Sequence, residues 1–105
     1  MQNDDIEAGL TKFETAIAKV LVSLAPGDVM TYGEVCEEAD YPRRARAVGR
    51  FLATKEGYPW WRVVNSVGRL APNNVDSQTA LLRGEGVDVV DGHVVGMRRR
   101  RADRS

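Results

Sequence analysis

The chain has few of the residues on which covalent and metal chemistry depend. Its 105 residues include one cysteine, Cys36, and one histidine, His93. A single cysteine cannot form an internal disulfide, and one cysteine with one histidine is too small a set for a structural zinc site. We therefore expect no disulfide, no bound metal and no cofactor.

Long hydrophobic runs are also missing. No apolar stretch approaches the roughly 18 residues that a membrane span requires, and the polar, acidic start of the chain does not resemble a signal peptide. We therefore expect a soluble, cytoplasmic protein without a membrane contact. A chain of this length has room for one core, so we expect a single domain over residues 1–97 and a basic, disordered tail over residues 98–105. A monomer is the simplest expectation.

A net charge of one sign is absent too, because 15 basic residues balance 15 acidic ones. The balance hides an asymmetry along the chain. Residues 1–40 carry nine acids and two lysines, whereas residues 41–105 carry thirteen basic residues and six acids. A basic half indicates a polyanion such as nucleic acid as the partner, although the same charges are also compatible with a solvated surface.

Apolar spacing in the first half of the chain predicts two helices. Apolar residues recur every three or four positions from Leu10 to Leu24, which predicts an amphipathic helix that ends before Pro26-Gly27. Thr31 and Glu34 fit a capping box, which predicts a short helix to about residue 39.

A third helix is predicted from Tyr41-Pro42 to about Thr54, with the proline in its first turn. Together with the short helix before it, this helix would form a helix-turn-helix and would be its recognition helix.

The remaining segments predict a small amount of strand. Residues 60–64 have an extended pattern, and Ser77 should cap a fourth helix that ends at Gly84 or Gly86. The valine-rich segment 87–95, with Asp91-Gly92 at its centre, predicts a two-residue hairpin. These elements predict a mainly α fold that contains a helix-turn-helix and a small β-hairpin.

The predicted recognition helix has an arginine-rich face. Arg43, Arg46 and Arg50 are three and four residues apart, while apolar residues occupy a different face. Like charges at this spacing oppose helix formation by roughly 0.2 to 0.5 kcal/mol per pair, so a counter-anion such as phosphate would stabilise the helix. Aromatic residues among these charges favour nucleic acid. A solvated helix beside a core tryptophan pair is the alternative.

Four motifs follow one another within residues 29–86: MTYGEV at 30–35, RAVG at 46–49, PWWRVV at 59–64 and the LL and EG pairs within 81–86. On these motifs, the segment resembles the C-terminal, DNA-binding and active-site domain of the O6-alkylguanine-DNA alkyltransferases. The third motif aligns with the Pro-Cys-His-Arg-Val active-site motif of that family. The resemblance implies a fold class that is mainly α with a small β-hairpin, a winged helix-turn-helix-like DNA-binding domain as in the C-terminal domain of that family.

The resemblance also defines a departure at the active site. Trp60 stands where the family has its nucleophilic cysteine, and Trp61 stands where it has the activating histidine. An indole cannot supply the thiolate that alkyl transfer requires. The sequence is therefore similar to the alkyltransferase-like proteins, which implies no catalytic residues and no enzyme activity. The alternative is an alkyl acceptor at Cys36, which we instead expect to be an ordinary buried thiol.

The resemblance implies roles for individual residues. Arg46 matches the arginine that enters the base stack from the minor groove, and Tyr32 matches the tyrosine that rotates the target nucleotide out. Trp60 would offer a flat face to the flipped base. Many alkyltransferase-like sequences carry an arginine shortly after this loop that stacks on the modified base. Arg69 is a candidate for this role because it is an arginine, although the spacing of the family would place that residue nearer Asn73.

Glu85 matches the acid of the family's hydrogen-bond relay to cysteine. Since Trp61 interrupts that relay, we expect a structural role for Glu85.

The expected site has two parts. The lesion pocket is expected to comprise Tyr32, Trp60, Trp61, Val63, Val64, Asn65, Ser66 and Arg69. The DNA-binding residues are expected to be Thr31, Tyr32, Arg43, Arg44, Arg46, Ala47, Gly49 and Arg50.

The resemblance implies non-enzymatic recognition of O6-alkylguanine in double-stranded DNA by base flipping, with signalling to nucleotide excision repair proteins. A winged-helix regulator without lesion preference is the alternative.

Overall fold

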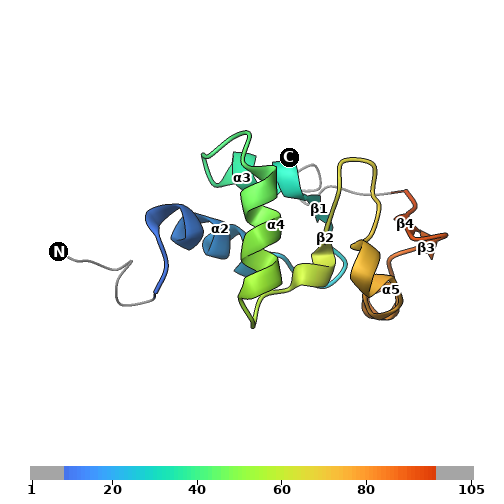
Figure 1. Ribbon diagram of the computed structural model, residues 1–105. Helices are drawn as coiled ribbons and strands as arrows, with labels where there is room; N and C mark the ends of the chain where they lie inside the picture. Colours follow the sequence, from blue (N-terminus) through green and yellow to red (C-terminus); the bar gives the residue numbers. More distant parts are fainter. Residues whose placement is uncertain (1–8, 97–105) are drawn as a thin grey trace.

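The computed structural model describes residues 9–96, so the expected basic tail lies outside the described residues. Short strands and single turns of 3-10 helix separate the helices (Figure 1). In order, the elements are α2 (Lys12–Val22), β1 (Met30–Thr31), α3 (Tyr32–Glu38), α4 (Ala45–Thr54), a 3-10 turn (Trp60–Arg62), β2 (Val63–Val64), a second 3-10 turn (Pro72–Asn74), α5 (Val75–Gly84), β3 (Val89–Val90) and β4 (His93–Val94). The expected fold class, mainly helical with small sheets, is confirmed. Within the described range, no helix is long and apolar enough to span a membrane.

Helix α2 forms where the apolar spacing predicts it. Thr11 begins it with a capping box: its hydroxyl accepts from the Glu14 amide at 3.0 Å, and Glu14 accepts from the Thr11 amide at 3.0 Å. This capping box was not predicted. The buried face of the helix carries Ile17, Val20 and Leu21, which confirms the amphipathic stripe.

Helices α3 and α4 form the helix-turn-helix. The predicted capping box at the start of α3 is confirmed, because the Thr31 hydroxyl accepts from the Glu34 amide and the Glu34 carboxylate accepts from the Thr31 amide. The predicted start of α4 at Tyr41-Pro42 is wrong, since the helix begins at Ala45. Arg43 has a φ of 66°, which lies outside the helical region, so residues 41–44 form the turn between the two helices.

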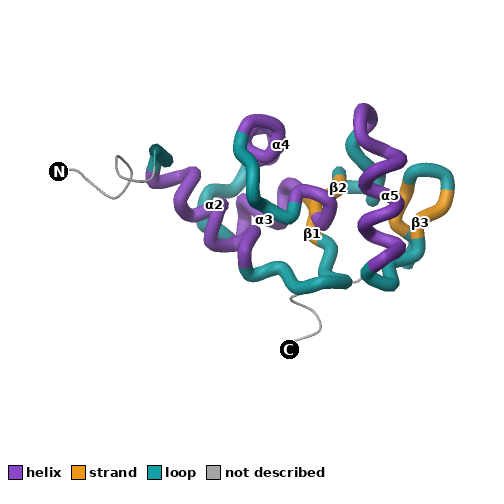
Figure 2. The backbone as a smooth tube through the Cα atoms, turned by 90° about the horizontal axis from the view of Figure 1, so that it is seen from below, coloured by secondary structure: helices purple, strands orange, loops and turns teal. Residues whose placement is uncertain are grey.

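A short parallel pairing joins the helix-turn-helix to the second half of the chain. Met30 pairs with Val63 and Thr31 pairs with Val64, and these strands lie between α2, α3 and α4 on one side and α5 with the hairpin on the other (Figure 2). The expectation of an extended segment over residues 60–64 is only partly right, because residues 60–62 form a 3-10 turn.

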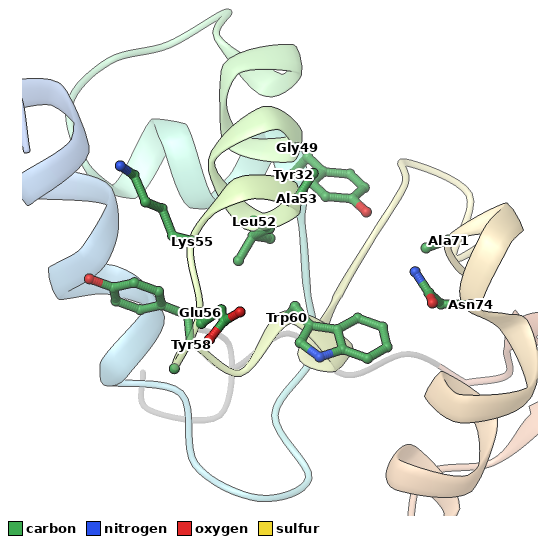
Figure 3. A pocket seen from close by; sticks show the side chains of 11 residues that line it. Tyr32, Gly49, Leu52, Ala53, Lys55, Glu56, Tyr58, Trp60, Ala71 and Asn74 are labelled. Atoms are coloured by element: carbon green, nitrogen blue, oxygen red, sulfur yellow. The ribbon is translucent and has the colours of Figure 1, made fainter.

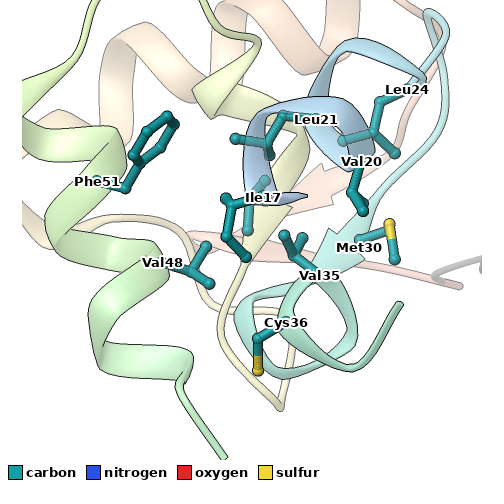
Figure 4. Packing of buried hydrophobic residues seen from close by; sticks show 10 residues of the cluster. Ile17, Val20, Leu21, Leu24, Met30, Val35, Cys36, Val48 and Phe51 are labelled. Atoms are coloured by element: carbon teal, nitrogen blue, oxygen red, sulfur yellow. The ribbon is translucent and has the colours of Figure 1, made fainter. Parts of the chain in front are cut away.

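Successive residues of a strand face opposite ways, and β2 therefore contributes to two hydrophobic clusters. Figure 4 shows the cluster among α2, α3 and α4. Val63 belongs to this cluster. Val64 belongs to a second cluster with Leu82 of α5, Val89 and Val94 of the hairpin, and two residues outside these elements, Val29 and Leu70. The two strands thus hold both clusters together.

The C-terminal part of the described chain contains α5 and the hairpin. Helix α5 begins at Val75 and not at a Ser77 cap, because the 3-10 turn that starts at Pro72 leads directly into it. The hairpin is confirmed: β3 and β4 are antiparallel, and the turn residues Asp91 and Gly92 have φ values of 51° and 75°. Positive φ at both positions is the signature of a type I′ turn.

Candidate functional site

A pocket of about 500 Å³ opens between α4, the loop that follows it and the segment before α5. In Figure 3, Tyr32 and Trp60 lie on two sides of this pocket, with Leu52 and Ala53 on a third side and Ala71 and Asn74 across from them. The lining residues are Tyr32, Gly49, Leu52, Ala53, Lys55, Glu56, Gly57, Tyr58, Trp60, Ala71 and Asn74. The pocket thus combines flat aromatic faces with small apolar side chains.

The backbone pairing of β1 with β2 sets the positions of the two aromatic residues. Tyr32 directly follows β1, and Trp60 begins the 3-10 turn that leads into β2. Burial raises the pKa of the Tyr32 phenol above its usual value, so this hydroxyl stays neutral near pH 7 and is able to donate a hydrogen bond. Trp60 packs edge-on against Trp61, with ring centroids 6.2 Å apart and an interplanar angle of 88°.

The structure places Tyr32 and Trp60 in the pocket but puts the other expected lesion-pocket residues elsewhere. Val63 is fully buried in the first cluster and Val64 in the second, and Trp61 packs on the second cluster. Asn65, Ser66 and Arg69 belong to the turn after β2, where the Asn65 side chain accepts from the amides of Val67 and Arg69. None of these six lines the described pocket.

Sequence reasoning did not predict several residues that complete the pocket, and it had assigned Gly49 to the DNA-binding surface instead. Gly49, Leu52 and Ala53 of α4 recur at spacings of three and four, which places them on one face of that helix. This spacing was a usable signal for the α4 wall. Ala71 and Asn74 come from a long-range approach that no local pattern predicts.

Glu85 is the centre of a charged network behind the pocket. Its carboxylate accepts from the Arg62 guanidinium at 2.6 Å, from the Trp61 indole at 2.8 Å and from the Gly27 amide at 2.9 Å. Burial alone would raise the pKa of Glu85, but these hydrogen bonds outweigh burial and lower the pKa from 4.5 to about 2. Arg62 also donates to the Leu24 carbonyl at 2.9 Å, so the network joins three segments. The expected structural role of Glu85 agrees with these contacts.

Gln78 of α5 connects two sides of the pocket from behind. Its fully buried amide donates to the carbonyls of Trp61 and Val63 and accepts from the Ala71 amide at 2.8 Å. One side chain thereby links the segment that carries Trp60 with the segment that carries Ala71.

Helix α4 presents its arginines to solvent. Arg46 and Arg50 are exposed, while Val48 and Phe51 face the core. Because Arg46 precedes the pocket residue Gly49 by three positions, it lies on the same face of α4 one turn earlier. Ala47 and Gly49 are half-buried.

Other expected DNA-binding residues have additional or different roles. Arg43 is exposed in the turn before α4, and Arg44, also exposed, lies 5.3 Å from the Phe13 ring centroid and 5.7 Å from that of Tyr41. Thr31 is only 7% exposed and its hydroxyl caps α3, so the structure gives it a structural role.

Cys36 lies in the first hydrophobic cluster, with no exposed surface. Its thiol donates to the Gly33 carbonyl at 3.2 Å, and its sulfur accepts from the Arg44 amide at 3.4 Å. The contacts of this side chain hold the turn between α3 and α4, and Cys36 is not among the residues that line the pocket.

The helix-turn-helix, its exposed arginines and the adjoining pocket define a DNA-binding domain. Residues 12–87 match the family model described as the DNA-binding domain of 6-O-methylguanine DNA methyltransferase. The chain belongs to this family.

Two curated relatives carry the name DNA base-flipping protein. The protein from Vibrio parahaemolyticus is 35% identical over 95 residues, which cover 86% of this chain and 95% of the relative. The protein from Escherichia coli strain K12 is 35% identical over 94 residues, which cover 85% of this chain and 73% of the relative.

Solved structures with the same fold include complexes with DNA. S. pombe Atl1 bound to damaged DNA containing O6-carboxymethylguanine superposes with a TM-score of 0.69 at 29% identity, covering 86% of this chain and 83% of Atl1. Mycobacterium tuberculosis OGT in complex with DNA gives a TM-score of 0.63 at 29% identity and covers 71% of this chain and 50% of OGT.

Proposed function

We propose that this protein recognises O6-alkylguanine in double-stranded DNA by flipping the base, without repairing it. The observation that carries the proposal is the pocket in which Tyr32 and Trp60 meet beside α4, one helical turn beyond the exposed Arg46. Relatives named for base flipping, and the likeness to Atl1 bound to damaged DNA, support the same function.

The proposed mechanism uses α4 as the DNA-contacting helix from the minor-groove side. Arg43 and Arg50 would meet phosphates, while the Arg46 guanidinium fills the space that the flipped nucleotide leaves. Tyr32 would press on the adjacent phosphate, and Trp60 would stack against the flipped base. Flipping costs a few kcal/mol, and this cost falls when alkylation has already weakened the guanine pair, so selection of the lesion begins before the base reaches the pocket.

The absence of repair follows from the chemistry of the site. An indole at position 60 offers no thiolate for alkyl transfer, and the single cysteine of the chain is sealed in the core. The complex would therefore persist as a mark on the DNA. We propose, from the family resemblance, that a monomer in the cytoplasm presents this mark to nucleotide excision repair proteins.

The test compares two duplexes that differ only in guanine or O6-methylguanine at one position. We expect tighter binding to the methylated duplex, by about tenfold or more, because its weakened pair lowers the cost of flipping. Fluorescence anisotropy at fixed salt measures both affinities. Equal affinity would refute lesion recognition and would indicate a regulator that binds intact DNA.

A second expected outcome concerns Cys36. Because the thiol is buried, a disulfide reagent should modify it in native protein only as fast as the protein unfolds, and rapidly in denaturant. Duplexes with a labelled O6-methyl group should transfer no label to the wild-type protein. Label on the protein that disappears in Cys36→Ser would show that the chain is an alkyl acceptor after all.

A further inference from the structure

Asn74 occupies an unusual position at the pocket. It immediately precedes α5 and is the N-cap residue of that helix, yet its side chain makes no capping hydrogen bond. Asparagine is among the most favoured N-cap residues, with a typical contribution of about 1 kcal/mol. Instead, the side chain lines the pocket, and Figure 3 shows its amide on the side across from Leu52 and Ala53, near Trp60.

The backbone beneath Asn74 is held in place. The Asn74 amide donates to the Ala71 carbonyl at 3.0 Å, and the Ala71 amide donates in turn to the buried side chain of Gln78 at 2.8 Å. The side chain of Asn74 therefore extends from a fixed turn. A fixed backbone position reduces the conformational freedom that is lost on binding, which favours a specific contact.

Two of the other polar lining residues point elsewhere. In Figure 3 the ammonium of Lys55 and the ring of Tyr58 point away from the space between Tyr32 and Trp60, whereas the Tyr32 hydroxyl points toward the side of Ala71 and Asn74. Glu56 lies between Tyr58 and Trp60. Tyr58 packs against Phe51, with ring centroids 5.0 Å apart. Asn74 is the lining side chain that combines two N–H donors with a carbonyl acceptor, on a wall otherwise formed by Ala71.

An amide in the pocket can distinguish O6-alkyl groups by whether they carry a hydrogen-bonding atom. A hydrocarbon chain at O6 offers the amide no partner, and burying an unpaired amide beside it is unfavourable. A chain that ends in a hydroxyl can donate to the amide carbonyl or accept from its N–H groups. We propose that Asn74 is a specificity-determining residue, which favours O6-adducts with a hydrogen-bonding group on the alkyl chain over pure hydrocarbon chains of the same length. This inference rests on the proposed function.

The test uses duplexes with O6-(2-hydroxyethyl)guanine and O6-propylguanine, whose chains have equal numbers of heavy atoms. We expect the ratio of affinities, hydroxyethyl over propyl, to fall by about three- to tenfold in Asn74→Leu, the equivalent of one hydrogen bond. The control is Ser77→Leu, because Ser77 is exposed in the first turn of α5 and does not line the pocket. The ratio in this control should equal the wild-type ratio, and thermal melting checks that both variants fold.

The outcomes separate this inference from the function on which it rests. The role of Asn74 would be overturned if Asn74→Leu kept the wild-type ratio, or if the ratio fell equally in Ser77→Leu. Lesion recognition would still stand in that case if the wild type prefers O6-methylguanine to guanine. If the wild type does not prefer O6-methylguanine to guanine, both lesion recognition and the role of Asn74 are overturned.

Discussion

Replacing Arg46 with alanine should reduce the affinity for O6-methylguanine duplexes by about one hundredfold. The guanidinium is proposed to fill the gap in the base stack, so its loss leaves the cost of flipping, a few kcal/mol, without compensation. Truncation of a central arginine at an interface commonly costs about 2 kcal/mol or more. The side chain is exposed, so the melting temperature should change little. Anisotropy titrations with the guanine and O6-methylguanine duplexes measure the effect.

Arg50→Ala is the matched control on the same helix. Arg50 is also exposed and is proposed to contact phosphate alone, so its loss should weaken binding to both duplexes by the same few-fold factor. The slope of log affinity against log salt should fall by about one. If Arg46→Ala behaves in the same way as Arg50→Ala, Arg46 is a phosphate contact and the assignment to the base stack is wrong.

Replacing Glu85 with alanine should lower the free energy of unfolding by about 3 kcal/mol. The change leaves the Arg62 guanidinium, whose side chain is only 11% exposed, without its ion-pair partner, and it also removes the acceptor of the Trp61 indole. Breaking one partner of a buried pair costs this much because a charge remains unpaired. The melting temperature should fall by roughly 15 °C in a domain of this size. Asp88→Ala, at an exposed position nearby, should be within about 0.5 kcal/mol of the wild type.

The pH dependence of stability gives an independent measure of the same network. The pKa of Glu85 is about 2 in the folded protein and near 4.5 in the unfolded chain. The folded state therefore gains stability from the ionised carboxylate above pH 4.5 and loses this gain as the pH falls from 4.5 towards 2. Denaturant titrations over this range should show a shallower loss in Glu85→Gln. An equal loss in variant and wild type would exclude Glu85 as the source.

Local patterns in the sequence predicted those parts of the fold that local chemistry determines. The capping box of Thr31 and Glu34 and the turn at Asp91-Gly92 each depend on a few adjacent residues, and both are confirmed. The start of α4 was predicted wrongly, because Pro42 is compatible with a helix start as well as with a turn. The positive φ of Arg43 in the structure shows that this segment is a turn and not the first turn of a helix.

Residues of the site could be predicted from the sequence only where they belong to a recognisable motif. Tyr32 and Trp60 each belong to a recognisable motif, and both line the pocket. The opposite side, Ala71 and Asn74, depends on the hydrogen bonds of Gln78, which is 17 residues from Trp61 in the chain. The partners of Glu85 are separated from it by 23 to 58 residues. No periodicity within one segment contains such information, because these contacts exist only after the segments have packed together.

The pairing of β1 with β2 has a consequence for the tolerance of the chain to insertions and deletions. The spacing between Tyr32 and Trp60 depends on the register of Thr31 with Val64, and a strand advances about 3.3 Å per residue. One residue added between Trp60 and Val63 would therefore move the Trp60 indole away from the Tyr32 phenol by about the thickness of a stacked base. If the indole stayed in place, the register of β2 would shift by one residue, and side chains that face one hydrophobic cluster would face the other. Length changes should consequently accumulate among relatives outside residues 60–64, in exposed turns such as the one at Ser66 and Val67.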